Sequence, residues 1–257
     1  MAIYLDSLIV EVTRKCNLEC EHCLRGEPQD KNAALSALDL LLDEIDHIGT
    51  IVLTGGEPLL DPFSLSDILL QLKAHDIGIN SFYLATNGTV CSDETLLLLV
   101  EWWLYMRACS GEFEPEDLAC VEWSNDSYHT DFTDAEALAK LKALAFARPK
   151  YSSEFRIRDE YVIPEGRAQT WGQGRLPSIY PVEIEEYDDI DYHIMGDLYL
   201  NCDGMLINGC DWSYETQASN SDVRIIHVPT WKSETGKDRY KSLVQVLQEY
   251  NGRITRQ

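Results

Sequence analysis

Three cysteines near the start of the chain have the spacing that iron–sulfur chemistry needs. Cys16, Cys20 and Cys23 stand with three and two residues between them. Thiolates this close together can hold one face of a cuboidal cluster. Four protein ligands would close such a cluster, whereas three leave one iron open to a small molecule. The number of cysteines therefore favours catalysis over electron storage.

Two other uses of these cysteines stay open on the spacing alone. His22 stands between the second and third cysteine and offers a fourth ligand for zinc, although structural zinc sites normally pair two groups of ligands. A protein that binds a cluster or carries electrons without turnover would use the same three thiolates. A metal assay distinguishes a zinc-stabilised structural module from a cluster-binding protein. A pocket for an amino acid distinguishes an enzyme from an electron carrier, because a carrier has no need of such a pocket.

Three further polar segments follow predicted strands, where α/β proteins collect their chemistry. In the first segment, two glycines let the backbone approach a ligand closely, and the Glu57 carboxylate can accept bonds from an ammonium group. Taken alone, each segment would equally make an ordinary turn. The segments are Gly55-Gly56-Glu57-Pro58, Thr86-Asn87-Gly88 and Ser124-Asn125-Asp126.

The cysteine spacing after a first strand, with Gly55-Gly56-Glu57-Pro58 after a second, resembles the radical S-adenosylmethionine (SAM) superfamily over roughly residues 7–167. The resemblance implies a partial (β/α)6 TIM-like barrel, a 4Fe-4S cluster on the three cysteines, and SAM bound at the open iron. One electron, from a donor such as flavodoxin or ferredoxin, then splits SAM into a 5′-deoxyadenosyl radical that abstracts hydrogen from a substrate. In this chemistry the protein binds and orients the cofactor and the substrate, and it excludes water from the site.

The same resemblance implies a set of SAM-binding residues. Gly55, Gly56 and Glu57 match the segment that receives the methionyl amino group. The residue before the third cysteine is usually aromatic in the family; here it is His22, which we expect to lie against the adenine. The remaining positions are expected to contact the ribose, the carboxylate or the substrate; they are Thr86, Asn87, Ser124, Asn125 and Asp126.

Strand and helix patterns alternate along the first 167 residues. This order predicts an α/β fold with parallel strands and crossover helices, as in doubly wound sheets or barrels. Apolar runs predict strands at 8–12, 50–54, 82–85, 118–123 and 154–163. Apolar residues at helical spacing predict helices at 35–45, 65–72, 92–106 and 133–144.

The predicted strand 154–163 is unusual because Glu154, Arg156, Arg158 and Glu160 alternate with other residues. Four charges on one strand face would be costly in a dry core. They suit the wet mouth of a barrel, where Arg158 is a candidate to bind a carboxylate. A salt-bridged, half-exposed edge strand explains the pattern equally well.

Residues 168–257 are expected to form a C-terminal extension of the core at 1–167. A hairpin at about 198–210, turning at Asp203-Gly204, and a terminal helix at 240–250 are predicted, and a sixth barrel strand is either abbreviated or near Leu198. The hairpin resembles the start of the auxiliary-cluster (SPASM/twitch) module. Cys202 and Cys210 are too few to hold a second cluster, so we expect a cluster-free remnant.

The other cysteines and one short segment complete the expectations. Cys91, Cys109 and Cys120 are expected to be core residues. Gly166-Arg167-Ala168 resembles a stretch late in the barrel of many peptide-modifying members. The expected substrate is a peptide or a small polar molecule, and the hairpin and this stretch favour the peptide.

Composition limits the partners. The net charge of −23 argues against nucleic acid, because phosphate binding needs a basic surface. The first residues lack the basic segment of a secretory signal. The longest apolar stretch, residues 96–106, is interrupted by Glu101 and is shorter than the about 20 residues that span a bilayer. A cytoplasmic protein without a membrane partner is expected.

Overall fold

Strand β1 (Ile3–Thr13) runs through the middle of the sheet and leads directly into the cysteine loop. From Leu8 to Thr13 its residues are buried on both faces, as expected of a central parallel strand. Leu8 and Val10 belong to the main core together with residues of the helices, whereas Ile9 packs with Tyr199 and Ile207 in a second cluster. The strand therefore separates two apolar layers.

The computed structural model describes residues 2–110, 120–129, 134–150, 157–187, 191–233 and 241–256. Within these ranges nine strands form one sheet in the order β5-β4-β3-β2-β1-β7-β8-β9, with β6 paired to β7. Strands β1 to β5 and β7 are parallel, so their carboxyl ends meet at one edge. The strands after β1 are β2 (His47–Gly55), β3 (Gly78–Thr86), β4 (Val121–Trp123), β5 (Ala147–Pro149), β6 (Glu183–Tyr187), β7 (Asp191–Leu200), β8 (Met205–Asn208) and β9 (Arg224–His227).

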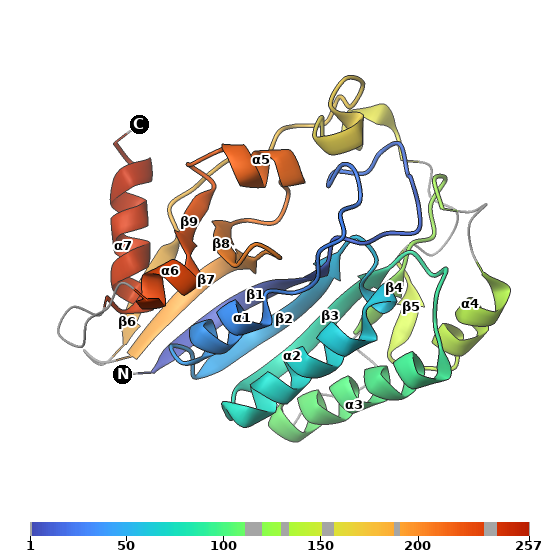
Figure 1. Ribbon diagram of the computed structural model, residues 1–257, viewed down its shortest axis with the longest axis horizontal. Coiled ribbons are helices and arrows are strands. Elements are labelled where there is room, and N and C mark those ends of the chain that lie inside the picture. The colour runs from blue at the N-terminus through green and yellow to red at the C-terminus, as the bar shows by residue number, and fades with distance from the viewer. Residues whose placement is uncertain are drawn as a thin grey trace.

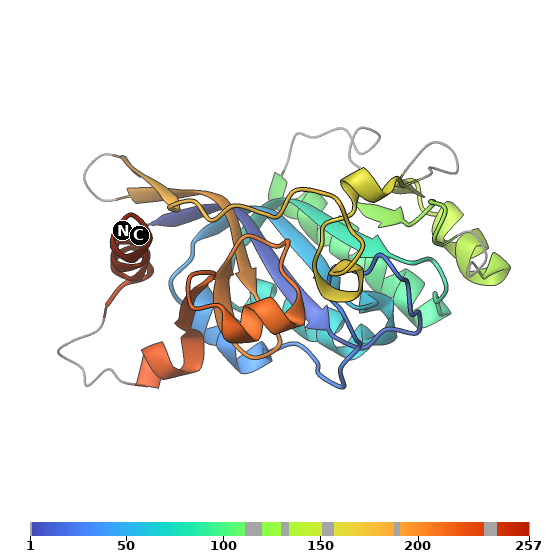
Figure 2. The same cartoon turned by 90° about the horizontal axis from the view of Figure 1, so that it is seen from above.

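Helices α1, α2 and α3 cover one face of the sheet, and residues 170–182 cross the other (Figure 1 and Figure 2). Ile179 of the crossing segment packs against both apolar clusters. The α-helices are α1 (Leu35–Leu42), α2 (Pro62–Ala74), α3 (Asp93–Ser110), α4 (Ala135–Lys142), α5 (Tyr214–Ser219), α6 (Val228–Ser233) and α7 (Leu243–Ile254). The described residues also form the short 3-10 helices η1 (Pro58–Leu60), η4 (Asp159–Tyr161) and η5 (Gly166–Ala168).

The first four predicted strands and all four helices of the core are present. The strands at 8–12, 50–54 and 82–85 are longer than predicted and form β1, β2 and β3. Helix α4 begins at Ala135, and the Asp134 side chain caps it by accepting from the Ala137 N–H. The predicted start of this helix at Thr133 lies outside the described residues, as does Leu118 before β4. The terminal helix begins at Leu243 with a capping box between Ser242 and Gln245.

The predicted strand 154–163 is wrong where it can be checked. Residues 154–156 lie outside the described ranges, and Arg158 precedes the 3-10 helix η4 with its side chain 74% exposed. The fifth strand is instead β5, paired with β4 just after Phe146. Phe146 is buried against Trp103, with ring centroids 5.5 Å apart. This apolar anchor places the strand earlier in the chain than the alternating charges suggested.

The fold is a mixed α/β structure with a largely parallel sheet, in keeping with the expected partial TIM-like barrel, and the sheet does not close. The sixth parallel strand is β7, which contains Leu198 and pairs with β1 rather than with β5. Leu198 and Leu200 join the main core and Tyr199 the second cluster, so β7 is apolar on both faces. Strands from 168–257 thus extend the same sheet as the predicted core.

The predicted hairpin is confirmed. Strands β7 and β8 are antiparallel, and the four residues Asn201 to Gly204 connect them. Gly204 has a φ of +72°, the left-handed conformation that such a turn requires. Among the helices of the described ranges, none has the length and the apolar character needed to cross a membrane.

Candidate active site

The cysteine loop is fastened to the turn after β2 by the backbone itself. The Gly56 N–H donates to the Thr13 carbonyl at 2.8 Å, and the Glu57 N–H donates to the Lys15 carbonyl at 2.7 Å. A Cβ on Gly55 would meet the Thr13 oxygen, and one on Gly56 would lie 2.2 Å from the Lys15 oxygen. Only glycine allows two backbones to approach this closely. The two sequence motifs are therefore one structural unit.

Glu57 ties this unit to the third turn from inside the protein. The residue is fully buried, and its carboxylate accepts from the Leu59 N–H at 3.0 Å, the Thr86 hydroxyl at 2.8 Å and the Asn87 N–H at 2.7 Å. Burial raises the pKa of Glu57 to about 7, although these hydrogen bonds act in the opposite direction. The carboxylate fixes the start of η1 and the turn after β3 in relation to each other.

The turn after β3 reaches back to the cysteine loop. The Asn87 side-chain amide donates to the Asn17 side chain at 3.0 Å, and Asn17 donates to the Thr89 hydroxyl at 2.8 Å. Asn17 is the neighbour of Cys16. Thr86 and Asn87, both predicted from the sequence, thus support the loop that carries the cysteines.

The three cysteines fit a cluster-binding role. Cys16, Cys20 and Cys23 are free, and each is half-buried. Burial raises the pKa of the Cys16 thiol, and the neighbouring charges of Glu57, Cys23 and Cys20 act in the same direction. Three thiolates in a half-buried loop, with an acceptor-rich turn beside them, match a cuboidal cluster with one open iron. The donor set fits the implied group.

A histidine that the sequence did not point to lies against the second cysteine. His129 Nε2 is 3.6 Å from Cys20 Sγ, and His129 Nδ1 is 2.7 Å from a carboxylate oxygen of Asp126. Burial would lower the pKa of His129, but the bonds with Asp126 and Cys20 raise it to about 9. The only sequence signal was a histidine three residues after Asp126 at the end of a strand.

His22 lies in the same cluster of rings. Its ring stacks on Tyr128 with centroids 4.2 Å apart and meets His129 edge-on at 5.3 Å. Burial and the neighbouring His129 lower the pKa of His22 to about 4, so the ring is neutral. Its Nδ1 is buried without a partner among the described residues. His22 is therefore a flat, uncharged surface beside the cysteines.

Comparison with known proteins identifies the family. The model of the "Radical SAM superfamily" matches residues 10–105, the segment from β1 to α3 that contains the cysteine loop, the Gly-Gly-Glu turn and the turn after β3. This segment of the chain is thus assigned to the radical SAM superfamily. Members of this family use a 4Fe-4S cluster and SAM, the pair for which the cysteines and the adjoining turns are suited.

Two relatives differ in how much they share with this chain. The Bacillus subtilis protein named "Putative protein YfkA" is 39% identical over 85 residues, which is 30% of this chain and 22% of that protein. The chain thus spans about a fifth of the length of that relative. A 7-carboxy-7-deazaguanine synthase of Halobacterium salinarum is 27% identical over 200 residues, covering 67% of this chain and 75% of that enzyme.

A solved structure supports the radical SAM fold along nearly the whole chain. Native anSMEcpe with bound AdoMet and Cp18Cys peptide matches with a TM-score of 0.52 and 14% sequence identity, covering 98% of this chain and 82% of that one. At this identity the likeness concerns the fold alone. The auxiliary-cluster module expected in the C-terminal part is not established by these likenesses.

The other predicted site residues lie at different distances from this centre. The Ser124 N–H donates to the Thr86 carbonyl at 2.8 Å, which holds the turn after β4 beside the turn after β3. Asp126 is buried and its carboxylate accepts from His129 and from the Tyr128 N–H. Arg158 contacts Glu160 at 3.5 Å on the surface, so the structure does not bring it to the radical SAM centre.

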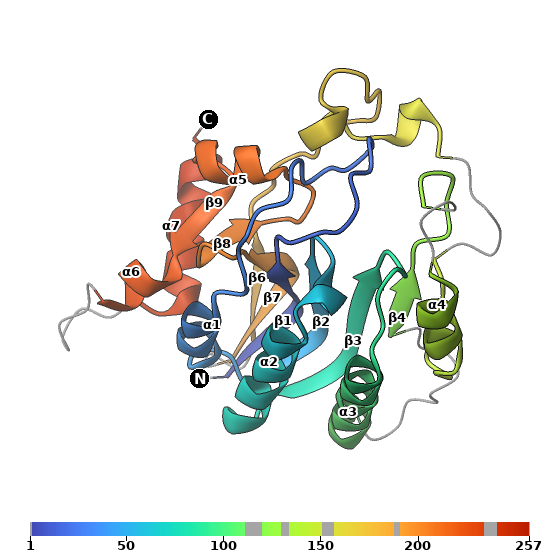
Figure 3. The ribbon, with the colours of Figure 1, turned by 45° about the vertical axis from the view of Figure 1, so that its right-hand side comes forward.

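Behind the third cysteine lies a cavity of about 410 Å³. The Arg167 N–H donates to the Cys23 carbonyl at 3.0 Å, and the Tyr214 N–H donates to the Arg25 carbonyl, so the cavity is bounded by the cysteine loop, η5 and α5. Figure 3 shows the loop passing between α5 and the segment that contains η5. Residues that line the cavity include Arg25, Gln29, Arg167, Ser213, Tyr214 and Glu215.

A buried ionic network joins β1 to the C-terminal part. Glu11 accepts from Arg14 at 2.8 Å, from the Tyr199 hydroxyl at 2.7 Å and from the Cys202 N–H at 2.7 Å. Arg14 also contacts Asp203 at 3.0 Å and stacks over the Tyr214 ring. Glu11 and Arg14 are 0% and 2% exposed. The family's first strand is thus bound to the hairpin turn and to α5.

The remaining cysteines occupy ordinary positions. Cys202 faces the Glu11 backbone and Cys210 faces Asp211. Cys91 and Cys120 are buried, as expected, but Cys109 is exposed. It lies in the last turn of α3, beyond the buried face of that helix, and the expectation of a core position was wrong for this residue.

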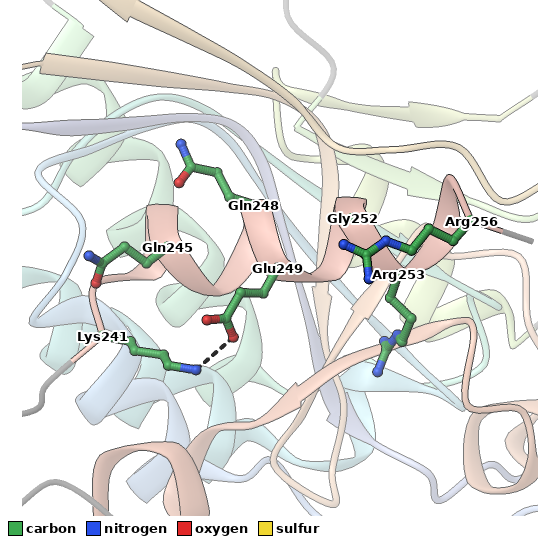
Figure 4. A pocket seen from close by; sticks show the side chains of 7 residues that line it. All are labelled: Lys241, Gln245, Gln248, Glu249, Gly252, Arg253 and Arg256. Carbon is green, nitrogen blue, oxygen red and sulfur yellow. Dashed lines mark hydrogen bonds and ion pairs between the residues drawn. The ribbon is translucent and has the colours of Figure 1, made fainter.

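A groove of about 700 Å³ along α7 is larger than the cavity but lacks the features of a site. Its lining side chains come from α7 and the residues just outside it, and Lys241 pairs with Glu249 at 2.7 Å (Figure 4). Helix α7 packs beside β9, away from the cysteine loop that follows β1 (Figure 1). We regard the groove as the polar outer face of an amphipathic helix.

Proposed function

We propose that this protein is a radical SAM enzyme that cleaves SAM reductively and abstracts hydrogen from a small polar substrate. The observation that carries the proposal is the joining of the cysteine loop to the Gly55-Gly56-Glu57 turn through two backbone hydrogen bonds. When bound, the cluster and SAM would supply one-electron cleavage of the sulfonium bond and hydrogen-atom abstraction from the substrate. The electron comes from an external donor such as flavodoxin or ferredoxin.

The residues of this chain have binding and orienting roles in the proposal. Cys16, Cys20 and Cys23 hold three irons and leave the fourth for SAM. The turn at Gly55-Gly56-Glu57 receives the methionyl ammonium, and the buried Glu57 carboxylate keeps that turn in register with Thr86 and Asn87. His22 offers a neutral ring face to the adenine, since its stacking on Tyr128 already aligns it with an aromatic surface.

A small substrate is favoured over a peptide by two observations. The cavity behind Cys23 has the volume range of small-molecule sites. The relative that aligns over 67% of this chain is a 7-carboxy-7-deazaguanine synthase, whose name describes a small heterocyclic product. The peptide-bound anSMEcpe structure resembles this chain in fold only. A peptide substrate stays the second candidate, supported by the likeness of Gly166-Arg167-Ala168 to peptide-modifying members.

The test is anaerobic reconstitution with iron and sulfide, followed by SAM and dithionite. The wild-type protein should bind about four irons and form 5′-deoxyadenosine, measured by liquid chromatography and mass spectrometry. Cys20→Ala should abolish the product. Cys109→Ala removes an exposed thiol and should leave both readouts unchanged.

Equal 5′-deoxyadenosine from wild type and Cys20→Ala would refute the enzyme. Stoichiometric zinc without iron uptake would support the zinc-stabilised module. A bound cluster without any SAM cleavage would support the electron carrier. Once cleavage is established, pools of small polar metabolites and of peptides are compared for the one that increases 5′-deoxyadenosine formation.

A further inference from the structure

His129 has a partner at each of its two ring nitrogens. Nδ1 faces the Asp126 carboxylate at 2.7 Å, and Nε2 faces Cys20 Sγ at 3.6 Å. His129 is 8% exposed and Asp126 is 4% exposed, so solvent does not compete strongly for either contact. The Tyr128 N–H also donates to the same Asp126 oxygen, at 2.9 Å, which fixes the carboxylate. The hydrogen-bonded series Asp126–His129–Cys20 is thus held in place at Asp126.

The chemistry of the two partners defines what the ring does. An ionised carboxylate and a thiolate both accept hydrogen bonds and donate none. A histidine that bonds to both must therefore donate from both nitrogens. A cationic ring with one anionic acceptor at each nitrogen makes two charge-assisted hydrogen bonds, which are stronger than bonds between neutral groups.

A direct metal site at this place agrees less well with the distances. His22, Asp126 and His129 each offer a ligand atom within 4.8 Å of one another. However, Asp126 and His129 Nδ1 lie 2.7 Å apart, which is a hydrogen bond. Two ligands of one tetrahedral zinc are separated by roughly 3.3 Å, given metal–ligand lengths near 2.0 Å. The pair is arranged as a carboxylate that orients a histidine, not as two ligands.

We propose that His129, oriented by Asp126, donates a hydrogen bond to the Cys20 sulfur and thereby raises the reduction potential of the cluster. This inference rests on the proposed function, because it assumes a cluster on Cys20. His129 is a positioning residue that acts through Cys20. His129 lies outside residues 10–105, the segment that the family model matches.

The direction of the effect follows from charge. Reduction adds one negative charge to the cluster, and part of that charge resides on the sulfurs. A donor aimed at a ligand sulfur stabilises the reduced state more than the oxidised state, and hydrogen bonds to sulfur are among the features that set iron–sulfur potentials. A half-buried site increases the effect, because screening by water is weaker there.

The experiment is a redox titration of the reconstituted protein followed by EPR spectroscopy of the reduced cluster. His129→Leu should shift the equilibrium toward the oxidised cluster about tenfold at a fixed potential, equivalent to about 59 mV for a one-electron couple. Asp126→Asn should shift it in the same direction, because an amide no longer stabilises a cationic ring. His129→Gln retains an N–H donor and should shift it less.

A matched control is available on the surface. His75 pairs with Asp39 at 2.9 Å, the same chemistry far from the cysteines, and His75→Leu should leave the potential unchanged. Iron content is measured for every variant. A His129→Leu protein with full iron and the wild-type potential would overturn the inference.

Two other outcomes are separable. Iron loss in both His129→Leu and His129→Gln would also overturn it, because His129 would then be needed to hold the cluster rather than to tune it. If the wild-type protein itself takes up no cluster, the proposed function fails first and this inference falls with it. The iron assay and the absence of an EPR signal identify that case before any variant is compared.

Discussion

Two fully buried glutamates hold two different parts of this molecule together. Among the residues that the structure describes, Glu57 bonds only to neutral donors, which come from the turns after β2 and β3. Glu11 bonds to a guanidinium, and its network reaches the hairpin turn and β7. Within the family segment, turn geometry alone satisfies the carboxylate. The network that reaches the C-terminal part instead contains a buried ion pair, which is costly to break.

The largest effect is expected from breaking the ion pair. Arg14→Met leaves the buried Glu11 side chain without its ion-pair partner, so the free energy of unfolding should fall by about 3–5 kcal/mol. Urea denaturation of the protein measures it. Lys15→Met removes the neighbouring but exposed pair with Asp30 and should cost less than about 1 kcal/mol. Similar losses of unfolding free energy in Arg14→Met and Lys15→Met would mean that the buried ion pair stabilises the protein no more than the exposed one.

The second effect concerns Glu57 and pH. Its pKa in the folded chain is about 7, above the ordinary value of 4.5. Between these values the unfolded chain loses its proton first, so the wild-type free energy of unfolding should fall by up to about 3 kcal/mol as pH rises from 4.5 to 7. It should be level above that range.

The Glu57→Gln side chain cannot ionise, so the free energy of unfolding of this variant should not show this fall between pH 4.5 and 7. Urea titrations of both proteins without iron or SAM, at several pH values from 5 to 8, give the difference directly. Parallel profiles would show that Glu57 is ionised throughout and that its three donors compensate its burial fully.

A smaller effect is expected at the hydroxyl that joins the two turns. Thr86→Val removes the donor to Glu57 and the acceptor of the Gly88 N–H, and should cost about 1–2 kcal/mol. Thr50→Val removes a hydroxyl contact with Ser81 on a partly exposed strand and should cost about 0.5 kcal/mol or less. Thermal unfolding compares the pair, and the prediction fails if Thr50→Val proves the more damaging.

No effect on iron is expected from the C-terminal cysteines. A folded Cys202→Ser, Cys210→Ser double variant should retain the full wild-type iron content after reconstitution, because two cysteines are too few for a second cluster. A fall to about half of the wild-type iron would reveal an auxiliary cluster and make the C-terminal part a second redox site.

The sequence predicted those parts of the site whose contacts are local. Cys16, Cys20 and Cys23 lie within one loop. The glycine pair at 55–56 was predicted to approach a ligand; in the structure the pair approaches the Thr13 and Lys15 carbonyls, a long-range contact that the sequence did not indicate. His129 was missed because its contact with Cys20 spans 109 residues and depends on how two loops pack. Strand β5 was misplaced because alternating charges imitated a strand, while the single buried Phe146 that fixes the true one gives no periodic signal.

The pairing of β1 with β7 has a consequence for synthesis on the ribosome. Ile3 pairs with Tyr192, so the edge of the first strand has no partner until almost two hundred residues have been made. At ordinary elongation rates this takes roughly 10–40 s. During that interval β1 exposes apolar side chains and free backbone groups, the combination that recruits other strands. A nascent chain of this protein should therefore depend on chaperones until β7 emerges, however stable the finished sheet is.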